Sequence, residues 1–276
     1  MTVATAIREG HALLAGSGVP VPRLTAEVLL GHALGQERTY LYGHTGRTLS
    51  GGELSAYQEA LRQRAGGTPT QYITGSQEFY GREFRVTPDV MIPRPETEFV
   101  IEAALELCRD SERMADAGCG SGAIAVTLQL ETGADVLATD ISPEAIRVAS
   151  ENARRLDANV RFLACDLLSG VAAQSVDLVA SNPPYVPQSD GPGLQREVRD
   201  FEPHVALFGG ADGMRFYRRL VEESPRVLRP GGWLIVEFGI RQSGPLRDML
   251  GPRWRETQVI DDLAGLPRVL ATRYCP

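Results

Sequence analysis

The stretch "DAGCGSG", residues 116–122, decides the fold because it joins a strand-like segment to a helix-like one. The strand-like segment is "RMADAG", and the helix-like segment that follows it is "SGAIAVTLQLE". Glycines at positions 118, 120 and 122 let the backbone approach a bound molecule closely. We therefore predict that residues 113–131 form the first strand, ligand loop and helix of an α/β domain.

Strand-like and helix-like segments keep alternating downstream of this loop. "ADVLATD" precedes the helical "SPEAIRVASENARRL", in which Ser142 is the expected N-cap and Pro143 the first helical residue. Further strands are expected at "VRFLACD", "VDLVASN" and "GGWLIVEFG", a helix through "MRFYRRLVEES", and a last, antiparallel strand at "RVLATRY". This alternation predicts an α/β fold in which helices cover both faces of a parallel sheet.

The residues upstream of the loop have a different character. Residues 1–75 are predicted to form a small helical domain, with helices at "TAEVLLGHALG" and "SGGELSAYQEALRQRAGG" that end at glycines. The segment "FYGREFRVTPDVMIP" is rich in aromatic and β-branched residues, which predicts a β-hairpin linker over residues 76–98. The α/β domain is then expected to cover residues 99–276.

The composition is that of a globular protein and argues against several classes. The chain has 276 residues, of which 43% are hydrophobic, and no apolar run reaches the roughly 18 residues that cross a membrane. The N-terminus "MTVATAIREGH" lacks a signal-peptide core, so we expect a cytoplasmic protein with no membrane partner. A net charge of −7 argues against direct nucleic-acid binding. Scattered Cys and His residues favour neither disulfides nor a metal site.

Acidic residues at the ends of the next two strands indicate the class of ligand. Asp140 ends the second strand, 22 residues after Gly118, and a carboxylate there can accept both hydroxyl hydrogens of a ribose. The glycine spacing is GxGxG, and this loop is tighter than the GxGxxG of dinucleotide sites. It suits S-adenosylmethionine, whose only anionic group is a carboxylate. Asp166 ends the third strand, where it can accept a hydrogen bond from the adenine amino group.

The stretch "SNPPYV", residues 181–186, follows the fourth strand and therefore faces the same crevice as the glycine loop. Asn182 precedes a proline, which holds its backbone extended, and Pro183 and Pro184 have no N–H group. The side-chain oxygen of Asn182 and the carbonyl of Pro183 are left as acceptors for a planar –NH2 group, on which Tyr185 can pack. These four residues are the predicted catalytic and substrate-binding clamp.

The clamp suits methyl transfer to a planar nitrogen, which is a poor nucleophile because its lone pair is delocalised. Two acceptors that bind its hydrogens can orient the nitrogen toward a sulfonium methyl group. Such orientation can lower the activation barrier by several kcal/mol. No general base of tuned pKa is required, because the proton can leave after the transfer. The motif by itself leaves open whether the –NH2 group belongs to adenine, cytosine, or an Asn or Gln side chain.

Along most of its length the sequence resembles the peptide chain release factor glutamine methyltransferases, the HemK-like family. Two strings separate this family from methyltransferases in general: "IPRPETE" at residues 92–98 and the "EP…AL…GG.DG" pattern at residues 202–213. The other matches are "TAEVLLGHALG", "QYITGSQEFYGREFRV", "DAGCGSGAIA", "DIS", "SNPPYV" and "FEPHVALFGGADGMRFYRRL".

The resemblance implies a seven-stranded class I, Rossmann-like methyltransferase domain, preceded by a helical substrate-recognition domain and a β-hairpin. It implies methylation of the glutamine side-chain nitrogen in the Gly-Gly-Gln tripeptide of class 1 release factors, with residues 94–98 near the methyl end of the cofactor. The family often has Trp directly after the third-strand acid, where this chain has Leu167. The predicted cofactor-binding residues are Asp116, Gly118, Cys119, Gly120, Ser121, Gly122, Asp140, Ile141, Asp166, Leu167 and Asn182.

Three other functions compete with methylation of release factors. A glutamine of a ribosomal protein is one alternative substrate, and the "IPRPETE" string argues for a release factor instead. An amino group of a DNA or RNA base is another, but such enzymes usually carry a basic face or an added recognition domain. A non-catalytic scaffold that only binds the cofactor would have no need for the clamp of residues 182–185.

Overall fold

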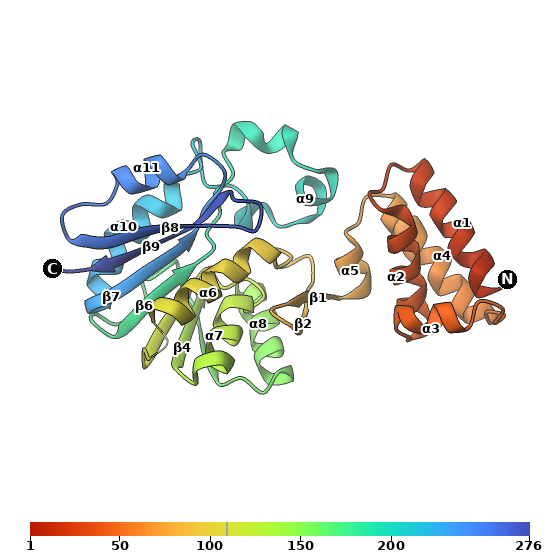
Figure 1. Ribbon diagram of the computed structural model, residues 1–276, viewed down its shortest axis with the longest axis horizontal. Coiled ribbons are helices and arrows are strands. Elements are labelled where there is room, and N and C mark those ends of the chain that lie inside the picture. Colours follow the sequence, from red (N-terminus) through yellow and green to blue (C-terminus); the bar gives the residue numbers. More distant parts are fainter. Residues whose placement is uncertain (109) are drawn as a thin grey trace. The chain divides into compact units, whose positions relative to one another are not determined.

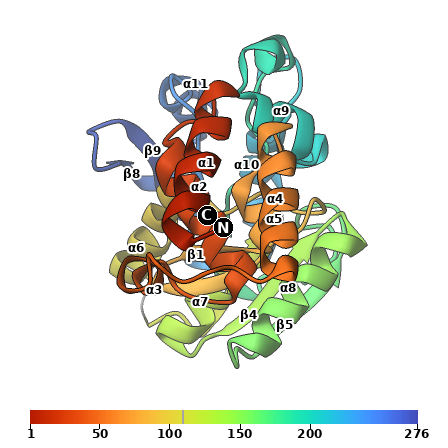
Figure 2. The same cartoon turned by 90° about the vertical axis from the view of Figure 1, so that its right-hand side faces the viewer.

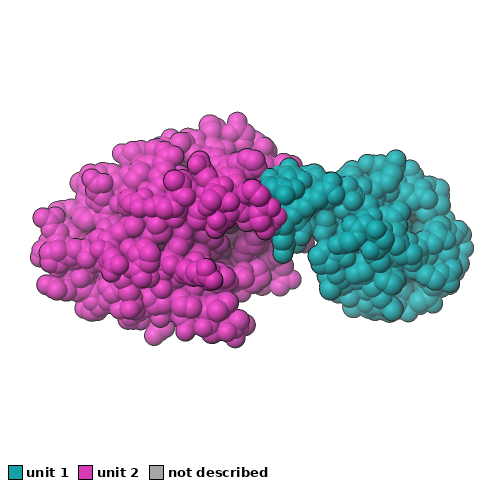
Figure 3. Space-filling view, turned by 90° about the horizontal axis from the view of Figure 1, so that it is seen from above, with its two compact units in different colours: residues 1–76, 195–201 teal, residues 77–194, 202–276 magenta. Residues whose placement is uncertain are grey.

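A computed structural model describes residues 1–108 and 110–276, which divide into two compact units. Unit 1 contains residues 1–76 together with residues 195–201, and unit 2 contains residues 77–194 and 202–276 (Figure 3). Among the described residues, no helix is long and apolar enough to cross a membrane.

Unit 1 is helical and has its own core. α1, α2 and α4 stand side by side (Figure 2), and Leu14, Leu29, Leu30 and Tyr57 are buried between them. Gly35 ends α2 in a left-handed conformation (φ 61°), as the sequence predicts. The helices of unit 1 are α1 (Val3–Gly16), α2 (Pro22–Leu34), α3 (Arg38–Gly43), α4 (Gly51–Ala65), α5 (Thr70–Thr74) and α9 (Arg196–Phe201).

A hairpin of β1 (Ser76–Phe79) and β2 (Arg82–Arg85) stands at the start of unit 2, where the sequence predicts one, with its first residue, Ser76, in unit 1. A seven-stranded sheet follows. Its strands are β3 (Arg113–Ala117), β4 (Asp135–Asp140), β5 (Val160–Ala164), β6 (Val176–Ser181), β7 (Leu228–Glu237), β8 (Trp254–Asp261) and β9 (Pro267–Tyr274). Its helices are η1 (Pro95–Thr97), α6 (Glu98–Leu107), α7 (Ala123–Thr132), α8 (Pro143–Arg155), η2 (Gln188–Gly193), η3 (His204–Ala206), α10 (Arg215–Val227) and α11 (Ser243–Asp248).

The strand order in the sheet is β5-β4-β3-β6-β7-β9-β8, and only the pairs that include β9 are antiparallel. Successive side chains point to opposite faces, so in β7 Trp233 and Ile235 enter one core while Leu234 and Val236 enter the other. α6, α7 and α8 cover the first face, and α10 and α11 cover the second (Figure 1). The predicted α/β fold is confirmed, including the antiparallel strand at "RVLATRY".

One strand of the sheet was not singled out by the sequence pattern. β8 lies at the edge of the sheet, and most of its residues are polar and at least partly exposed. A half-exposed edge strand gives a weaker apolar signal than β7, from which it is separated by β9. It is the antiparallel pairing with β9 that makes this segment a strand.

The strand order places the ligand crevice of the fold. From β3 the chain runs outward to β4 and β5 on one side, and β6 and β7 lie on the other side. Ligands of open α/β sheets bind outside the carboxyl ends of the strands at this switch of direction. The glycine loop after β3 and the "SNPPYV" stretch after β6 therefore lie next to each other.

Candidate active site

A cavity of about 300 Å³ lies at the carboxyl ends of β3, β4, β5 and β6. Most of the residues that the sequence singles out are brought together in its lining: Gly118, Cys119, Gly120, Ser121, Asp140, Ile141, Asp166, Leu167, Asn182 and Pro184. Asp116, Gly122, Pro183 and Tyr185 do not line it.

The glycine loop is held against the end of β4 by its own backbone. The N–H groups of Gly118 and Cys119 both donate to the carbonyl of Thr139, at 2.8 and 2.9 Å. Gly118, Gly120 and Gly122 have φ angles of 80°, 53° and 82°, which favour glycine because L side chains are strained there. The space that a Cβ atom would enter is open at Gly118 and Gly120, so a ligand can reach the backbone there.

Asp140 is tied to both sides of the loop. Its Oδ2 accepts a hydrogen bond from the N–H of Gly120 at 2.9 Å, and its Oδ1 accepts one from the N–H of Ser142 at 2.9 Å. Burial raises the pKa of this carboxyl above its usual value, and the backbone hydrogen bonds oppose that shift. Each oxygen keeps a second lone pair, so the fixed carboxylate can still accept from hydroxyl groups in the cavity.

Asp116 is fully buried beneath the loop and does not reach the cavity. Its Oδ2 accepts a hydrogen bond from the N–H of Ala125 near the start of α7, at 3.1 Å. Its Oδ1 has no hydrogen-bond partner among residues 1–108 and 110–276. Burial raises the pKa of Asp116 to about 8. This aspartate ties the end of β3 to α7.

The third-strand acid is engaged by a residue that the sequence analysis did not consider. Both oxygens of Asp166 accept hydrogen bonds from Nη1 of Arg219, at 2.8 and 3.0 Å. Leu167, the next residue, has a φ of 47°, and its buried side chain lines the cavity. Phe216 and Arg219, both on α10, line the cavity beside them. The helix itself was predicted, but which of its faces meets the cavity depends on how α10 packs on the sheet.

Asn182 is held by a chain of hydrogen bonds. Its Nδ2 donates to the hydroxyl of Thr97 at 2.9 Å, and that hydroxyl donates to Oε2 of Glu237 at 2.6 Å. The hydroxyl of Tyr185 donates to the other oxygen of Glu237, Oε1, at 3.3 Å. Asn182 and Thr97 both line the cavity. Neither Thr97 nor Glu237 was assigned a role of its own by the sequence, although Thr97 falls within the "IPRPETE" string.

The backbone of Pro184 and Tyr185 is supported closely from behind by three glycines. A Cβ atom on Gly213 would lie 2.3 Å from the carbonyl oxygen of Tyr185, and one on Gly209 would lie 2.6 Å from that of Pro184. A Cβ atom on Gly239 would lie 2.9 Å from the Tyr185 ring. The clamp is therefore fixed in place by chain segments that only glycine can supply at this distance.

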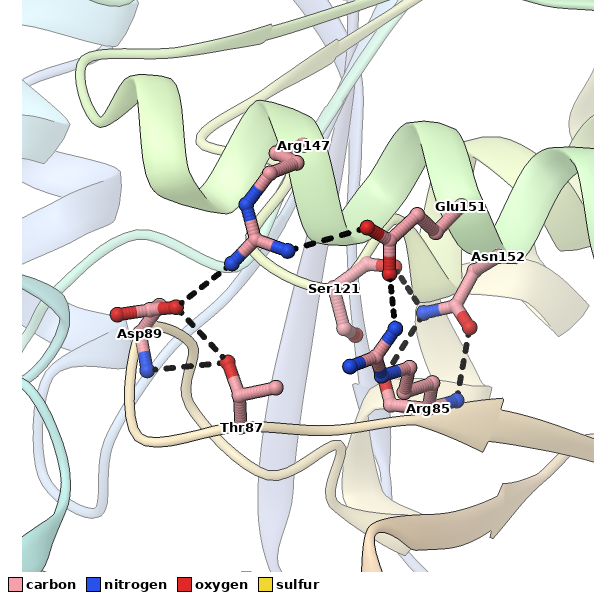
Figure 4. A network of polar contacts seen from close by, with 7 residues as sticks. All are labelled: Arg85, Thr87, Asp89, Ser121, Arg147, Glu151 and Asn152. Atoms are coloured by element: carbon pink, nitrogen blue, oxygen red, sulfur yellow. Dashed lines mark hydrogen bonds and ion pairs between the residues drawn. The ribbon is translucent and has the colours of Figure 1, made fainter.

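The segment between β2 and η1 carries Asp89 into the cavity lining and is anchored to α8 (Figure 4). Arg147 of α8 donates to Asp89 at 3.1 Å, and Asn152 exchanges hydrogen bonds with the backbone of Arg85 at 2.7 and 2.9 Å. Asn152 also donates to the carbonyl of Ser121 in the glycine loop, at 2.9 Å. One helix thus positions both the loop and the segment that faces it.

Comparisons with known proteins identify related domains in this chain. The family model described as "PrmC N-terminal domain" matches residues 5–75, and the one described as "Methyltransferase small domain" matches residues 97–195. Among solved structures, a methyltransferase from Pyrococcus furiosus has a TM-score of 0.55 at 18% identity, covering 72% of this chain and 91% of that one. This likeness shows the shared fold.

Relatives with much higher identity extend over the whole chain. A "Release factor glutamine methyltransferase" of Koribacter versatilis (strain Ellin345) is 45% identical over 277 residues, which cover 99% of each protein. One of Moorella thermoacetica is 43% identical over 275 residues, which cover 97% of each. Similarity of this extent confirms the resemblance seen in the sequence motifs, and the chain belongs to the release factor glutamine methyltransferase family.

Proposed function

We propose that the protein transfers a methyl group from S-adenosylmethionine to the side-chain amide nitrogen of the glutamine in the Gly-Gly-Gln tripeptide of class 1 release factors. The observation that carries this proposal is the position of Asn182. Thr97 holds the Asn182 amide by a hydrogen bond, and Asn182 lines the same cavity as the glycine loop and Asp140. The full-length relatives, which are named release factor glutamine methyltransferases, support a glutamine of a release factor as the substrate.

The residues of the cavity fit S-adenosylmethionine. Asp140 would hold the ribose hydroxyls, and the open backbone of Gly118 and Gly120 would lie along the ligand. Leu167 and Phe216 offer apolar surface for the adenine. Asp166 remains a predicted partner of the adenine amino group, with its carboxylate oriented by Arg219. When bound, S-adenosylmethionine supplies an electrophilic methyl group on a positively charged sulfur.

The chain contributes binding and orientation of the nucleophile. Asn182 Oδ1 and the carbonyl of Pro183 would accept the two hydrogens of the glutamine amide, which fixes the direction of its nitrogen lone pair. The ring of Tyr185, held by Glu237 and packed against Gly239, would bound the amide plane. Correct orientation of a bound nucleophile is worth several kcal/mol of the barrier.

The full-length relatives are named for a protein substrate that acts in translation, so we place the reaction in the cytoplasm and name class 1 release factors as the partners. Ribosomal proteins and nucleic-acid bases are the alternative carriers of a planar –NH2 group. No feature of the described residues favours either of them over the substrate named for the full-length relatives.

The test offers radiolabelled S-adenosylmethionine and the purified protein to four substrates in parallel. These are a class 1 release factor, the same factor with the tripeptide glutamine changed to alanine, unmodified DNA, and unmodified ribosomal proteins. Label on the intact release factor alone is the expected result, and it locates the methyl group. Label that persists on the alanine variant, or that appears on DNA or ribosomal proteins instead, would overturn the proposed substrate.

A further inference from the structure

We propose that Glu237 is a positioning residue for the reaction, which acts through Thr97 to orient the side-chain amide of Asn182 so that its oxygen faces the substrate. This inference rests on the proposed function. The three side chains come from β7, η1 and the loop after β6, so only the tertiary structure brings them together.

The orientation follows from counting hydrogens along the chain of hydrogen bonds. An ionised Glu237 carboxylate has no hydrogen, so the single hydrogen of the Thr97 hydroxyl is donated to it, at 2.6 Å. The Thr97 oxygen can then only accept, and its partner at 2.9 Å is the NH2 group of Asn182. The Asn182 oxygen is left as the acceptor at the cavity.

The opposite orientation would prevent productive binding. If the Asn182 amide were turned over, its NH2 group would face the NH2 group of the substrate, donor against donor. No hydrogen bond could form there, and a buried polar group left without a partner destabilises the complex. The relay from Glu237 therefore selects between two side-chain orientations that have nearly the same shape.

Glu237 is well placed for this role. It is 2% exposed, and each carboxylate oxygen already has a hydroxyl donor: Thr97 for Oε2 and Tyr185 for Oε1. Its backbone carbonyl accepts a hydrogen bond from the hydroxyl of Tyr217 on α10, at 3.0 Å. Glu237 is not among the residues that line the cavity, whereas Thr97 is, so the carboxylate acts through Thr97.

The charge state of Glu237 gives the relay a pH dependence. Burial raises the pKa of this carboxyl to about 7, the hydrogen bonds from Thr97 and Tyr185 lower it, and of the nearby charges Glu96 raises it while Arg268 lowers it. A protonated carboxyl can itself donate to Thr97, whose hydrogen is then free to turn toward Asn182. We expect turnover to fall as the pH drops below about 7, where the carboxyl gains its proton.

The kinetic test uses the full-length protein and the release factor. Thr97→Val removes the relay hydroxyl at nearly constant volume, and kcat is expected to fall about 10- to 100-fold while the affinity for S-adenosylmethionine, measured by calorimetry, stays within about threefold. Thr97→Ser keeps the hydroxyl and should restore kcat. Glu237→Gln cannot ionise, so its pH profile should lack the inflection near pH 7, while its amide oxygen can still accept from Thr97.

The matched control is Thr127→Val in α7. Thr127 is also a buried threonine, but its hydroxyl has no hydrogen-bond partner among the described residues. This variant should keep the wild-type kcat and pH profile. If Thr97→Val and Glu237→Gln did so too, the relay would be refuted.

A second measurement does not depend on the substrate. In nuclear magnetic resonance spectra of the protein, the side-chain NH2 signals of Asn182 should shift with pH at the same midpoint as the Glu237 carboxyl. Thr97→Val should abolish that coupling. If the release factor were not labelled at all, the proposed function would fail, and this coupling would still decide the relay. If the side-chain NH2 signals of Asn182 did not shift as Glu237 titrates, the inference would be overturned.

Discussion

At the scale of single residues, the site depends on side chains held by neighbours that are remote in the sequence. Asn182 is fixed by Thr97, Asp140 by the glycine loop, and Asp166 by Arg219. Local sequence motifs identified the predicted site residues. Their hydrogen-bond partners could not be predicted, because a hydrogen bond across 85 positions, such as that from Asn182 to Thr97, leaves no local pattern.

Asn182→Ala should separate binding from turnover. Removing the amide takes away one acceptor of the clamp but leaves the glycine loop and Asp140 in place. We expect kcat to fall about 100-fold or more, with the affinity for S-adenosylmethionine unchanged within about threefold. Single-turnover methylation and calorimetry measure the two quantities. Asn159→Ala at an exposed position is the control, and wild-type turnover in Asn182→Ala would contradict the clamp mechanism.

The buried carboxyl of Asp116 should make the free energy of unfolding depend on pH. Burial raises its pKa from 3.8 to about 8, so between these values the folded protein holds a proton that the unfolded chain has released. This group's contribution to stability is therefore largest below about pH 4 and is lost as the pH rises toward 8, by about 1.4 kcal/mol per pH unit.

Urea unfolding of the wild type and of Asp116→Asn between pH 5 and pH 8 measures this effect. The wild type should lose stability across the range, and the variant should lose less per pH unit because asparagine does not titrate. Glu237, whose pKa is raised to about 7, adds a decline of the same sign in both proteins. Equal slopes for the two proteins would show that Asp116 is ionised in the fold.

At the scale of elements, the segments between helices and strands shape the site. The segment before α10 places Gly213 against the carbonyl of Tyr185, and the segment between β2 and η1 is anchored to α8 through Arg147. Most strands and five helices (α2, α4, α7, α8 and α10) were predicted, because burial gives them a regular apolar pattern, whereas α1 and α6 were not. Their packing angles, which decide that Phe216 faces the cavity, follow from contacts with the whole sheet.

Gly213→Ala should disable the clamp more than backbone strain alone would. Gly213 and Gly133 have similar φ angles, 74° and 71°, so an alanine meets similar strain at either position. Only at Gly213 would the new Cβ clash, 2.3 Å from the Tyr185 carbonyl, whereas nothing lies within 4 Å at Gly133. Gly213→Ala should therefore lower kcat at least tenfold, and Gly133→Ala should cost only stability, about 1–2 kcal/mol. Equal kcat values for the two variants would contradict this account.

At the scale of the whole molecule, a segment far along the chain completes the helical unit. α9 belongs to unit 1, where Arg64 pairs with Glu197 at 2.7 Å. Arg64 also donates to the carbonyl of Thr68, and the side chains of Arg196 and Phe201 approach Gly67. Nothing in the local sequence of α9 indicates that it belongs with residues 1–76.

Glu197→Gln should loosen α9. The substitution leaves the guanidinium of Arg64, whose side chain is 8% exposed, without its carboxylate partner. Because Glu197 is itself 28% exposed, we expect the free energy of unfolding to fall by about 1–2 kcal/mol. Hydrogen exchange of the amides in residues 195–201 should speed up accordingly. Glu59→Gln breaks the exposed pair with Arg62 and should change exchange little. Unchanged exchange in Glu197→Gln would mean that the pair does not hold α9.

The sequence by itself determined the α/β class, the glycine loop, the end of β4 at Asp140 and the Asn-Pro-Pro-Tyr stretch. Each of these is encoded by neighbouring residues, through apolar periodicity or through the fixed backbone of glycine and proline. Only the tertiary structure decided the place of β8, the cavity face of α10, the attachment of α9, and the relay from Glu237 through Thr97 to Asn182. These depend on contacts between distant segments, whose energies arise only when the sheet and its helices have packed.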